Sequence, residues 1–307
     1  MGIVILAILL SKLDINQIIQ QLKQIDLCFY LYGLILFLPM ILCKSIRWRY
    51  LLHMQSISIT KKEALVFYTS GLFVGSITPG RFGEIIRVFY IKNKGYSTGK
   101  AFFSVFVDRL SDFLFLVGIG YLGMIFFFGL FTRSIELITL FFLTVAIAVL
   151  IYVSKKGREK GVVKWFFDFL LPEKNKKVII DNVQDFIKTF KILNFKYITF
   201  IIIITTGGWL FYYLQMFFLS KALGIDISFL LISAIVSVVA LAVLIPISIA
   251  GIGTRDAALA LLFSQVGISK ESAVAFSSLI LLTMVINTAM CSIGWFFNKQ
   301  EEEESVR

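Results

Sequence analysis

Two arginines stand beside glycine-rich interruptions in otherwise apolar sequence. Arg81 lies within residues 79–84, which read PGRFGE, and Arg255 lies within residues 251–256, which read GIGTRD. A helix that restarts after such an interruption points unpaired N–H groups and a partial positive charge at the break. This arrangement binds anions, and a guanidinium adds a full charge and paired donors that suit phosphate oxygens. We therefore predict anion binding by Arg81, Arg87, Arg255, Gly80, Gly83, Gly251 and Gly253.

These charges also have partners nearby in the sequence. Arg81, Glu84 and Arg87 are spaced at i, i+3 and i+6, and Arg255 directly precedes Asp256. Ions within a membrane are costly and are commonly paired. The alternative to anion binding is that these groups only pair with one another.

A third charged cluster lies between the two breaks. Asp108 and Asp112 share one helix face at i and i+4, and Arg109 stands between them. The cluster is interpreted either as a proton or cation relay and an acidic partner for Arg81 and Arg87, or as an ion network where a helix starts near the cytoplasmic interface. The residues predicted to form supporting ion pairs are Glu84, Asp108, Arg109, Asp112 and Asp256.

Several kinds of catalytic site lack the residues they need. His53 is the only histidine, which excludes most zinc sites and any Ser-His or Cys-His nucleophile system. Cys28, Cys43 and Cys291 lie in or beside apolar runs, which argues against a disulfide framework. A metal-dependent phosphotransferase needs more carboxylates than the cluster at Asp108 offers. We predict no metal, no cofactor and no catalytic residue.

The composition places these residues in a membrane. The chain has 307 residues, of which 58% are hydrophobic and 16% charged, against roughly 45–50% and about 25% in soluble domains. The charged residues, whose net charge is +11, flank apolar runs. They therefore indicate contact with an anionic membrane surface and not with nucleic acid. In this setting the natural anion for the arginines is the phosphate of a phospholipid or a polyprenyl phosphate.

The apolar runs predict an all-α integral membrane protein. Two runs are too short to span a bilayer, residues 64–77 and 257–267, and each adjoins one of the glycine breaks. We therefore expect about six spanning helices plus two re-entrant helical hairpins. The longer apolar runs cover residues 1–11, 27–43, 101–129, 135–153, 197–220, 228–249 and 272–297.

Basic residues predict the orientation, because loops rich in Lys and Arg stay in the cytoplasm. One such loop covers residues 154–196, whose interleaved aromatic residues favour an amphipathic helix on anionic lipid. Both termini then lie in the cytoplasm and the chain crosses the cell membrane several times. The other basic residues placed in cytoplasmic loops are Lys44, Arg47, Arg49, Lys61, Lys62, Lys92, Lys94 and Lys100.

A weak internal repeat suggests two related halves. Gly95-Tyr96-Ser97 after the first break parallels Gly267-Ile268-Ser269 after the second. The hairpin at 64–91 must enter from the cytoplasm and that at 228–267 from outside, which makes the repeat inverted, a pattern typical of transporters. The weak point is the run 228–249, which is long enough to span by itself. We assign residues 1–300 to a single membrane domain, with repeats at about 27–129 and 197–297, and residues 301–307 to an acidic tail.

The motifs resemble those of one known family. They are KSIRWR at 44–49, PGRFGE at 79–84 with Arg87, Asp108-Arg109, and PIS at 246–248 followed by GIGTRD. In order and spacing they are similar to the lysylphosphatidylglycerol synthase transmembrane region, or flippase-like domain, of bacterial multiple peptide resistance factors. The resemblance implies a helical membrane fold with re-entrant segments and a role in moving a lipid between leaflets.

The chain departs from the family pattern at its second break. Ile249 and Ala250 precede Gly251 where the family often has a Pro-Gly-Gly break, and Asp256 stands where it often has Glu. The soluble aminoacyl-transfer domain of the full synthases is absent from this sequence, so we do not expect lysyl transfer from tRNA.

Three functions remain open. The first is a lipid transporter that binds anionic headgroups between the two hairpins. The second is a membrane enzyme on a lipid-linked substrate, with Asp108 and Asp112 as its acid or base candidates. The third is a scaffold without transport activity for a separate lipid synthase. The expected partners are an anionic membrane lipid, such a synthase and further copies of the chain, but no nucleic acid.

Overall fold

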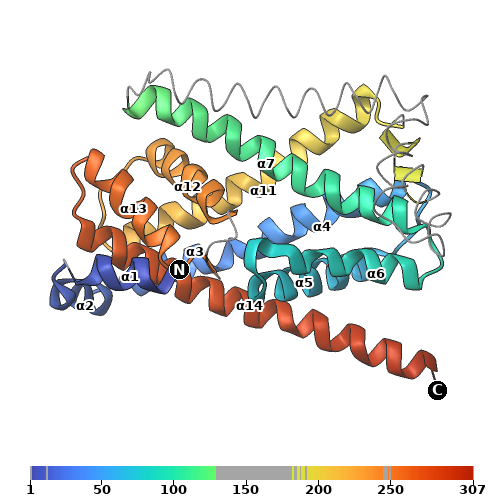
Figure 1. Ribbon diagram of the computed structural model, residues 1–307, viewed down its shortest axis with the longest axis horizontal. Coiled ribbons are helices and arrows are strands. Elements are labelled where there is room, and N and C mark those ends of the chain that lie inside the picture. The colour runs from blue at the N-terminus through green and yellow to red at the C-terminus, as the bar shows by residue number, and fades with distance from the viewer. Residues whose placement is uncertain are drawn as a thin grey trace, which may run out of the picture.

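The computed structural model describes residues 2–11, 13–128, 182, 185–186, 188–190, 192–244, 248 and 250–306, and its regular elements are all helical (Figure 1). The long apolar runs of the sequence form long helices that lie side by side, and the shorter runs form shorter helices. The elements are α1 (Gly2–Leu10), α2 (Ile15–Lys23), α3 (Leu27–Ile35), α4 (Phe37–His53), α5 (Lys61–Ile77), η1 (Pro79–Ile85), α6 (Ile86–Asn93), α7 (Thr98–Phe128), α11 (Phe195–Ala222), α12 (Phe229–Leu244), α13 (Thr254–Gln265) and α14 (Lys270–Val306).

Four of the predicted spanning helices are confirmed. They are α3 with α4, α7, α11 and α14, each long and apolar enough to cross a bilayer. At 1.5 Å per residue their apolar parts are about 40 Å long, which exceeds the roughly 30 Å hydrocarbon core. The chain is therefore a multi-pass membrane protein. Of the other runs, residues 1–11 form only the nine-residue α1, and residues 135–153 lie outside the described part.

The placement of Lys44 and Arg47 in a cytoplasmic loop is wrong. The helix that begins in the second apolar run continues through both residues to His53, and Arg47 is fully buried. Hydropathy ends the run at Lys44 because it counts each charge as exposed, whereas these side chains have partners inside the helix bundle. The carboxylates of α7 also lie deeper than the start of a helix: Asp108 is about 15 Å and Asp112 about 21 Å from its first residue.

Each glycine break separates a pair of shorter helices. The α5–α6 pair opens toward the end of the molecule where α4 stops, and a hydrogen bond from the Ser58 amide to the Tyr96 hydroxyl (3.3 Å) joins its two ends. The α12–α13 pair opens toward the end where α3 begins, since the Asp26 amide donates to the Ala222 carbonyl (2.9 Å) at the end of α11. The two pairs thus occupy opposite ends of the molecule (Figure 1). The described part of α12 has 16 residues, about 24 Å, which is less than the hydrocarbon core.

Local capping fixes where the first pair begins. The Thr60 hydroxyl accepts a hydrogen bond from the Glu63 amide (3.2 Å), and the Glu63 carboxylate accepts one from the Thr60 amide (2.7 Å). Such a capping box satisfies two of the donors that a helix start leaves unpaired. Burial disfavours the charged form of Glu63, but hydrogen bonds from Lys94 and Thr60 outweigh this effect, so the pKa of Glu63 lies below its usual range.

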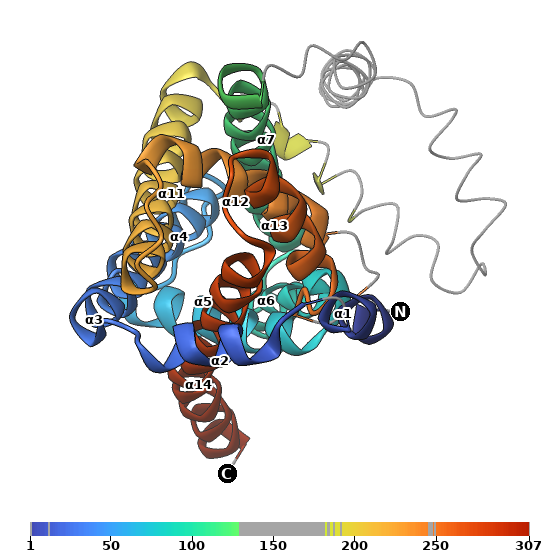
Figure 2. The ribbon, with the colours of Figure 1, turned by 90° about the vertical axis from the view of Figure 1, so that its left-hand side faces the viewer.

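The helices approach one another closely through small residues. Helix α7 packs on α12 at Gly123, where a Cβ would overlap the Cβ of Ala234, and α14 packs on α5 at Gly294 beside Thr69. In lipid such contacts are the main source of helix association, because apolar burial between helices gains little. Viewed along the bundle, α7, α12 and α13 lie on one side and α4 with α11 on the other, while α2 crosses the near end (Figure 2).

A single methyl group tests this packing. We expect Gly123→Ala to lower the free energy of unfolding by about 1–3 kcal/mol, because the added Cβ has no room against α12. The control is Gly118→Ala on the same helix, where a Cβ meets nothing within 4 Å and should be neutral or mildly stabilising. Thermal unfolding in detergent measures both, and equal midpoints for the two variants would contradict the close contact.

Candidate functional site

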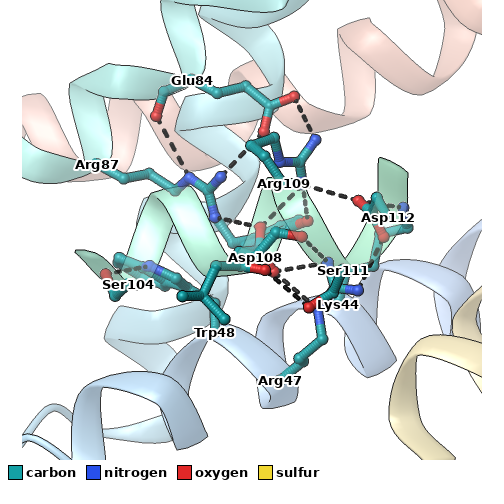
Figure 3. Close-up of polar contacts among 12 residues, drawn as sticks. Lys44, Arg47, Trp48, Glu84, Arg87, Ser104, Asp108, Arg109, Ser111 and Asp112 are labelled. Atoms are coloured by element: carbon teal, nitrogen blue, oxygen red, sulfur yellow. Dashed lines mark hydrogen bonds and ion pairs between the residues drawn. The ribbon is translucent and has the colours of Figure 1, made fainter. Parts of the chain in front are cut away.

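Seven charged side chains from four elements meet inside the bundle (Figure 3). We call them the ion network. Its carboxylates come from η1 and α7, and its cations from α4, α6 and α7. The members are Lys44, Arg47, Glu84, Arg87, Asp108, Arg109 and Asp112. Four cations face three carboxylates, so the network carries one more positive than negative charge.

Asp108 is the centre of the ion network. One carboxylate oxygen accepts from Arg47 Nε (2.8 Å), and the other accepts from Arg87 Nη1 (3.1 Å) and Arg109 Nη2 (2.9 Å). The Asp108 carbonyl also accepts from Arg47 Nη2 (3.1 Å). The residue is fully buried, and an unpaired carboxylate there would be very costly. The charge-assisted hydrogen bonds from three arginines offset that cost.

Asp112 joins α7 to α4 and α11. Its Oδ1 accepts from Arg47 Nη1 (2.8 Å) and from the indole of Trp209 (3.0 Å), and its Oδ2 accepts from Lys44 Nζ (3.2 Å). The Lys44 ammonium also lies 4.4 Å from the centre of the Trp209 ring, a favourable cation–π contact. Arg47 reaches α11 as well, through the Thr205 hydroxyl (2.9 Å).

Glu84 ties the first break to this network. Its two oxygens accept from Arg87 Nη2 (3.0 Å) and from Arg109 Nη1 (2.9 Å). Two glycines of α5 make room for these groups. A Cβ at Gly75 would lie 2.7 Å from Glu84 Cγ, and one at Gly71 would lie 2.9 Å from Arg87 Cγ.

The network is accessible on one side only. Arg87 is fully buried, with its guanidinium over the Tyr68 ring (4.6 Å), and Arg47 is equally enclosed. The side chain of Arg109 is 29% exposed, and its buried Nε has no hydrogen-bond partner among the described residues. Arg109 is therefore the partly exposed arginine of the network, whereas Arg87 is enclosed.

The first break exposes Arg81. Gly80 and Arg81 both have left-handed backbones, with φ of 61° and 59°, and the Gly83 amide donates to the Thr78 hydroxyl (2.8 Å). A left-handed backbone is strained for a residue other than glycine. Arg81 is exposed, and its guanidinium has no hydrogen bond or ion pair within the described part of the chain. Of the expected stripe, only Glu84 and Arg87 pair.

The second break is held by hydrogen bonds and not by ion pairs. The Asp256 carboxylate accepts from the Gly253 amide (2.7 Å) and so caps α13. Arg255 donates from Nε to the Ser277 hydroxyl (2.8 Å) and from Nη1 to the Ala250 carbonyl (3.3 Å). Arg255 is only 5% exposed, yet no described carboxylate lies within ion-pair distance of it. The neighbouring Asp256 serves the backbone instead.

The two helix pairs contact each other through η1 and α12. Helix α12 also contacts α11, where the ring of Tyr212 packs edge-on against Trp209 (5.2 Å between centroids), the residue that bonds Asp112. The second helix pair therefore adjoins both the first break and the helix that bonds the ion network.

The comparisons with known proteins now identify the family. The profile of the family described as the lysylphosphatidylglycerol synthase TM region matches residues 1–291. The chain belongs to this family. The resemblance inferred from the motifs is thereby confirmed.

Archaeal proteins named UPF0104 membrane protein are similar over nearly their whole lengths. The one from Methanocaldococcus jannaschii is 26% identical, covering 97% of this chain and 92% of the relative. That from Methanothermobacter thermautotrophicus is 23% identical, covering 98% and 95%. That from Pyrococcus horikoshii is 24% identical, covering 91% and 89%.

In this member of the lysylphosphatidylglycerol synthase TM family, the motifs converge in space. The predicted ion-pairing residues Glu84, Asp108, Arg109 and Asp112 form one network, while Asp256 lies apart at the second break. Sequence analysis missed Lys44 and Arg47 as members. Their signal was their spacing at i and i+3, which places both on one face of a continuing helix.

Removing the central charge tests the network. We expect Asp108→Asn to lower the free energy of unfolding by about 3–5 kcal/mol, because it leaves three arginines with one counter-charge fewer. The matched control is Asp226→Asn, which removes an exposed partner of Lys221 (3.1 Å) and should cost less than about 1 kcal/mol. Thermal unfolding in detergent compares them, and similar losses for both would refute the central role of Asp108.

Proposed function

We propose that this protein moves an anionic lipid between the leaflets of the cell membrane, with the lipid phosphate bound between the two breaks. The observation that carries the proposal is the pair Arg81 and Arg255. They come from opposite helix pairs, neither has a described acidic partner within ion-pair distance, and η1 of the first pair contacts α12 of the second. Anionic phospholipid and polyprenyl phosphate share the chemistry that such a site recognises.

The arrangement of the helix pairs supports alternating access. In this proposal α5–α6 and α12–α13 are re-entrant hairpins that enter from the cytoplasm and from outside, and they form the core of an inverted repeat. Their opening toward opposite ends of the molecule fits that reading (Figure 1). Broken helices at the centre of two inverted halves are the places where transporters commonly bind substrate.

The distribution of charge supports the orientation. Lys61, Lys62, Lys92, Lys94 and Lys100 lie near the open end of the first hairpin. At the opposite end, the described charges alternate in sign, as with Lys221 and Asp226. By the positive-inside rule the first end is cytoplasmic, and the C-terminus lies toward it (Figure 1). The described N-terminal helix α1 has nine residues, about 14 Å, and lies toward the opposite end, so a cytoplasmic N-terminus does not follow from this arrangement (Figure 1).

The pairing within the ion network favours transport over catalysis. An acid or base must be free to exchange a proton with substrate. Asp108 and Asp112 are each held by three or more donors, so they suit a fixed structural charge better. Binding of a separate lipid synthase, or of further copies of the chain, is compatible with transport.

Neutralising both arginines tests the proposal. In liposomes containing the purified protein and fluorescent phosphatidylglycerol, dithionite quenching reports exchange between leaflets. We expect Arg81→Gln with Arg255→Gln to reduce exchange to the level of protein-free liposomes, because the headgroup loses both charged donors.

The control makes the same chemical change elsewhere. Arg49→Gln removes a guanidinium that donates to the Ile59 carbonyl (2.9 Å) at the end of α4, away from both breaks, and should preserve exchange. Full exchange by the folded double variant would disprove headgroup binding at the arginines. A wild-type protein that exchanges no lipid but co-purifies with a synthase would favour the scaffold instead.

A further inference from the structure

A pocket lies between the N-terminal helices and the second break. Its volume is about 140 Å³, and its walls come from α1, α2, α13 and α14. Most of the lining is aliphatic, as with Leu10, Ile18 and Leu281. The polar lining consists of Arg255, Asp256, Ser277 and Ser278.

The polar end of this pocket carries a buried guanidinium with an unfilled donor. Arg255 is more than nine-tenths buried, and its two described hydrogen bonds go to the neutral oxygens of Ser277 and Ala250. Its Nη2 donates to no described residue. The neighbouring Asp256 also lines the pocket and supplies a nearby negative charge, but one of its oxygens caps the Gly253 amide and no ion pair joins it to Arg255. A buried donor without a partner is costly, so the pocket favours a ligand that brings an acceptor oxygen to Nη2, and a phosphate oxygen makes the strongest such bond.

The aliphatic walls indicate that the ligand carries a hydrocarbon group beside its charged head. A free inorganic anion would bring its charge to Arg255 but would leave Leu10, Ile18 and Leu281 facing empty space. Pockets for drug-sized ligands measure roughly 300–1,000 Å³, so a pocket of about 140 Å³ holds only part of a lipid. The fitting ligand is the junction between a charged head and a hydrocarbon chain, with the rest of the chain outside.

Few polar contacts hold the helices that cover the pocket. A single described side-chain hydrogen bond joins α2 to α14, from Gln21 Nε2 to the Ser272 hydroxyl (3.0 Å). The other polar atom of the Gln21 amide, Oε1, is buried without a described partner. The remaining contact is apolar: Ile18 packs on Val274 and Ala275, while Ile15 and Ile19 remain exposed. The leucines around this cluster are Leu9, Leu10, Leu13, Leu22 and Leu223. Lifting α2 therefore breaks one described side-chain hydrogen bond and an apolar contact that lipid chains can replace.

We propose that this pocket binds the head-to-chain junction of an anionic phospholipid, and that α1 with α2 forms a lid that opens to let the chain into the bilayer. The assignment rests on the proposed function. It adds a lateral route to Arg255 and the segment that controls the route. The phosphate reaches Arg255, and the chain leaves between the lid and α14.

Photolabelling tests the pocket. The probe is phosphatidylglycerol with a diazirine on the first carbons of one acyl chain, and mass spectrometry of peptides locates the label. We expect labelling of α1–α2 and α14, lost in Ser278→Phe, which fills the pocket, and kept in Leu282→Phe, which changes an exposed side chain on the same helix. Undiminished labelling in Ser278→Phe would overturn the assignment, as would displacement of the probe by inorganic phosphate.

Cross-linking tests the lid. Gln21→Cys and Ser272→Cys, in a background with Cys28, Cys43 and Cys291 replaced by Ser, are joined by a short reducible bis-thiosulfonate. We expect lipid exchange to stop on cross-linking and to return on reduction. The control pair is Ser97→Cys with Asp185→Cys, which also replaces a side-chain hydrogen bond (2.7 Å) but lies away from the lid, and it should exchange lipid in both states.

The outcomes separate this inference from the proposed function. If the linked lid exchanges lipid at the unlinked rate, the lid is refuted and transport stands. If the unlinked parent exchanges no lipid, the proposed function fails, whereas photolabelling still reports on the pocket.

Discussion

The packing of α4, α6 and α7 depends on one buried carboxylate, that of Asp108, which three arginines surround. Asp108 lies about 15 Å along α7, within a membrane protein, where an isolated charge of either sign would be prohibitive. The burial cost of Asp108 is offset by its hydrogen bonds with Arg47, Arg87 and Arg109, and the burial costs of those arginines are offset by the same bonds. Because the three arginines come from α4, α6 and α7, those helices have one register in which each buried carboxylate is paired. Gly71 and Gly75 leave room for the side chains of Arg87 and Glu84 in that register.

The same network explains why positive charge is left over. Three carboxylates cannot neutralise four cations, and the side on which the surplus is accessible is that of Arg109. Arg81 and Arg255 add two more guanidinium groups without described acidic partners. The proposed binding of an anion relies on this surplus of positive charge, which a network with equal numbers of cations and carboxylates would not provide.

Sequence reasoning predicted the parts that follow from composition and local pattern. Hydropathy found the spanning helices α7, α11 and α14, and glycine with arginine marked both breaks. It failed at Lys44 and Arg47, because a hydropathy window treats a charge as a helix boundary and contains no information about a partner 60 residues later. It also could not determine which of Arg81, Glu84 and Arg87 pair with one another. Arg81 has a left-handed backbone and no described ion pair, and a helical spacing rule does not anticipate such a backbone.

The two halves differ in how firmly their breaks are held. The first break is joined to α7 through Glu84 and Arg87 by several buried ion pairs, and separating buried partners costs several kcal/mol each. The second is held by hydrogen bonds from Arg255 to neutral oxygens, which contribute about 1.5–3 kcal/mol each. Helix α12 itself is packed closely on α7 at Gly123. In the proposed transport, the part that moves most easily is therefore the second break with α13, and not the whole α12–α13 pair. The proposed lid of α1 and α2 lies over this part, and the hydrogen bond from Gln21 to Ser272 is the described polar contact to α14 that an opening toward the bilayer must break.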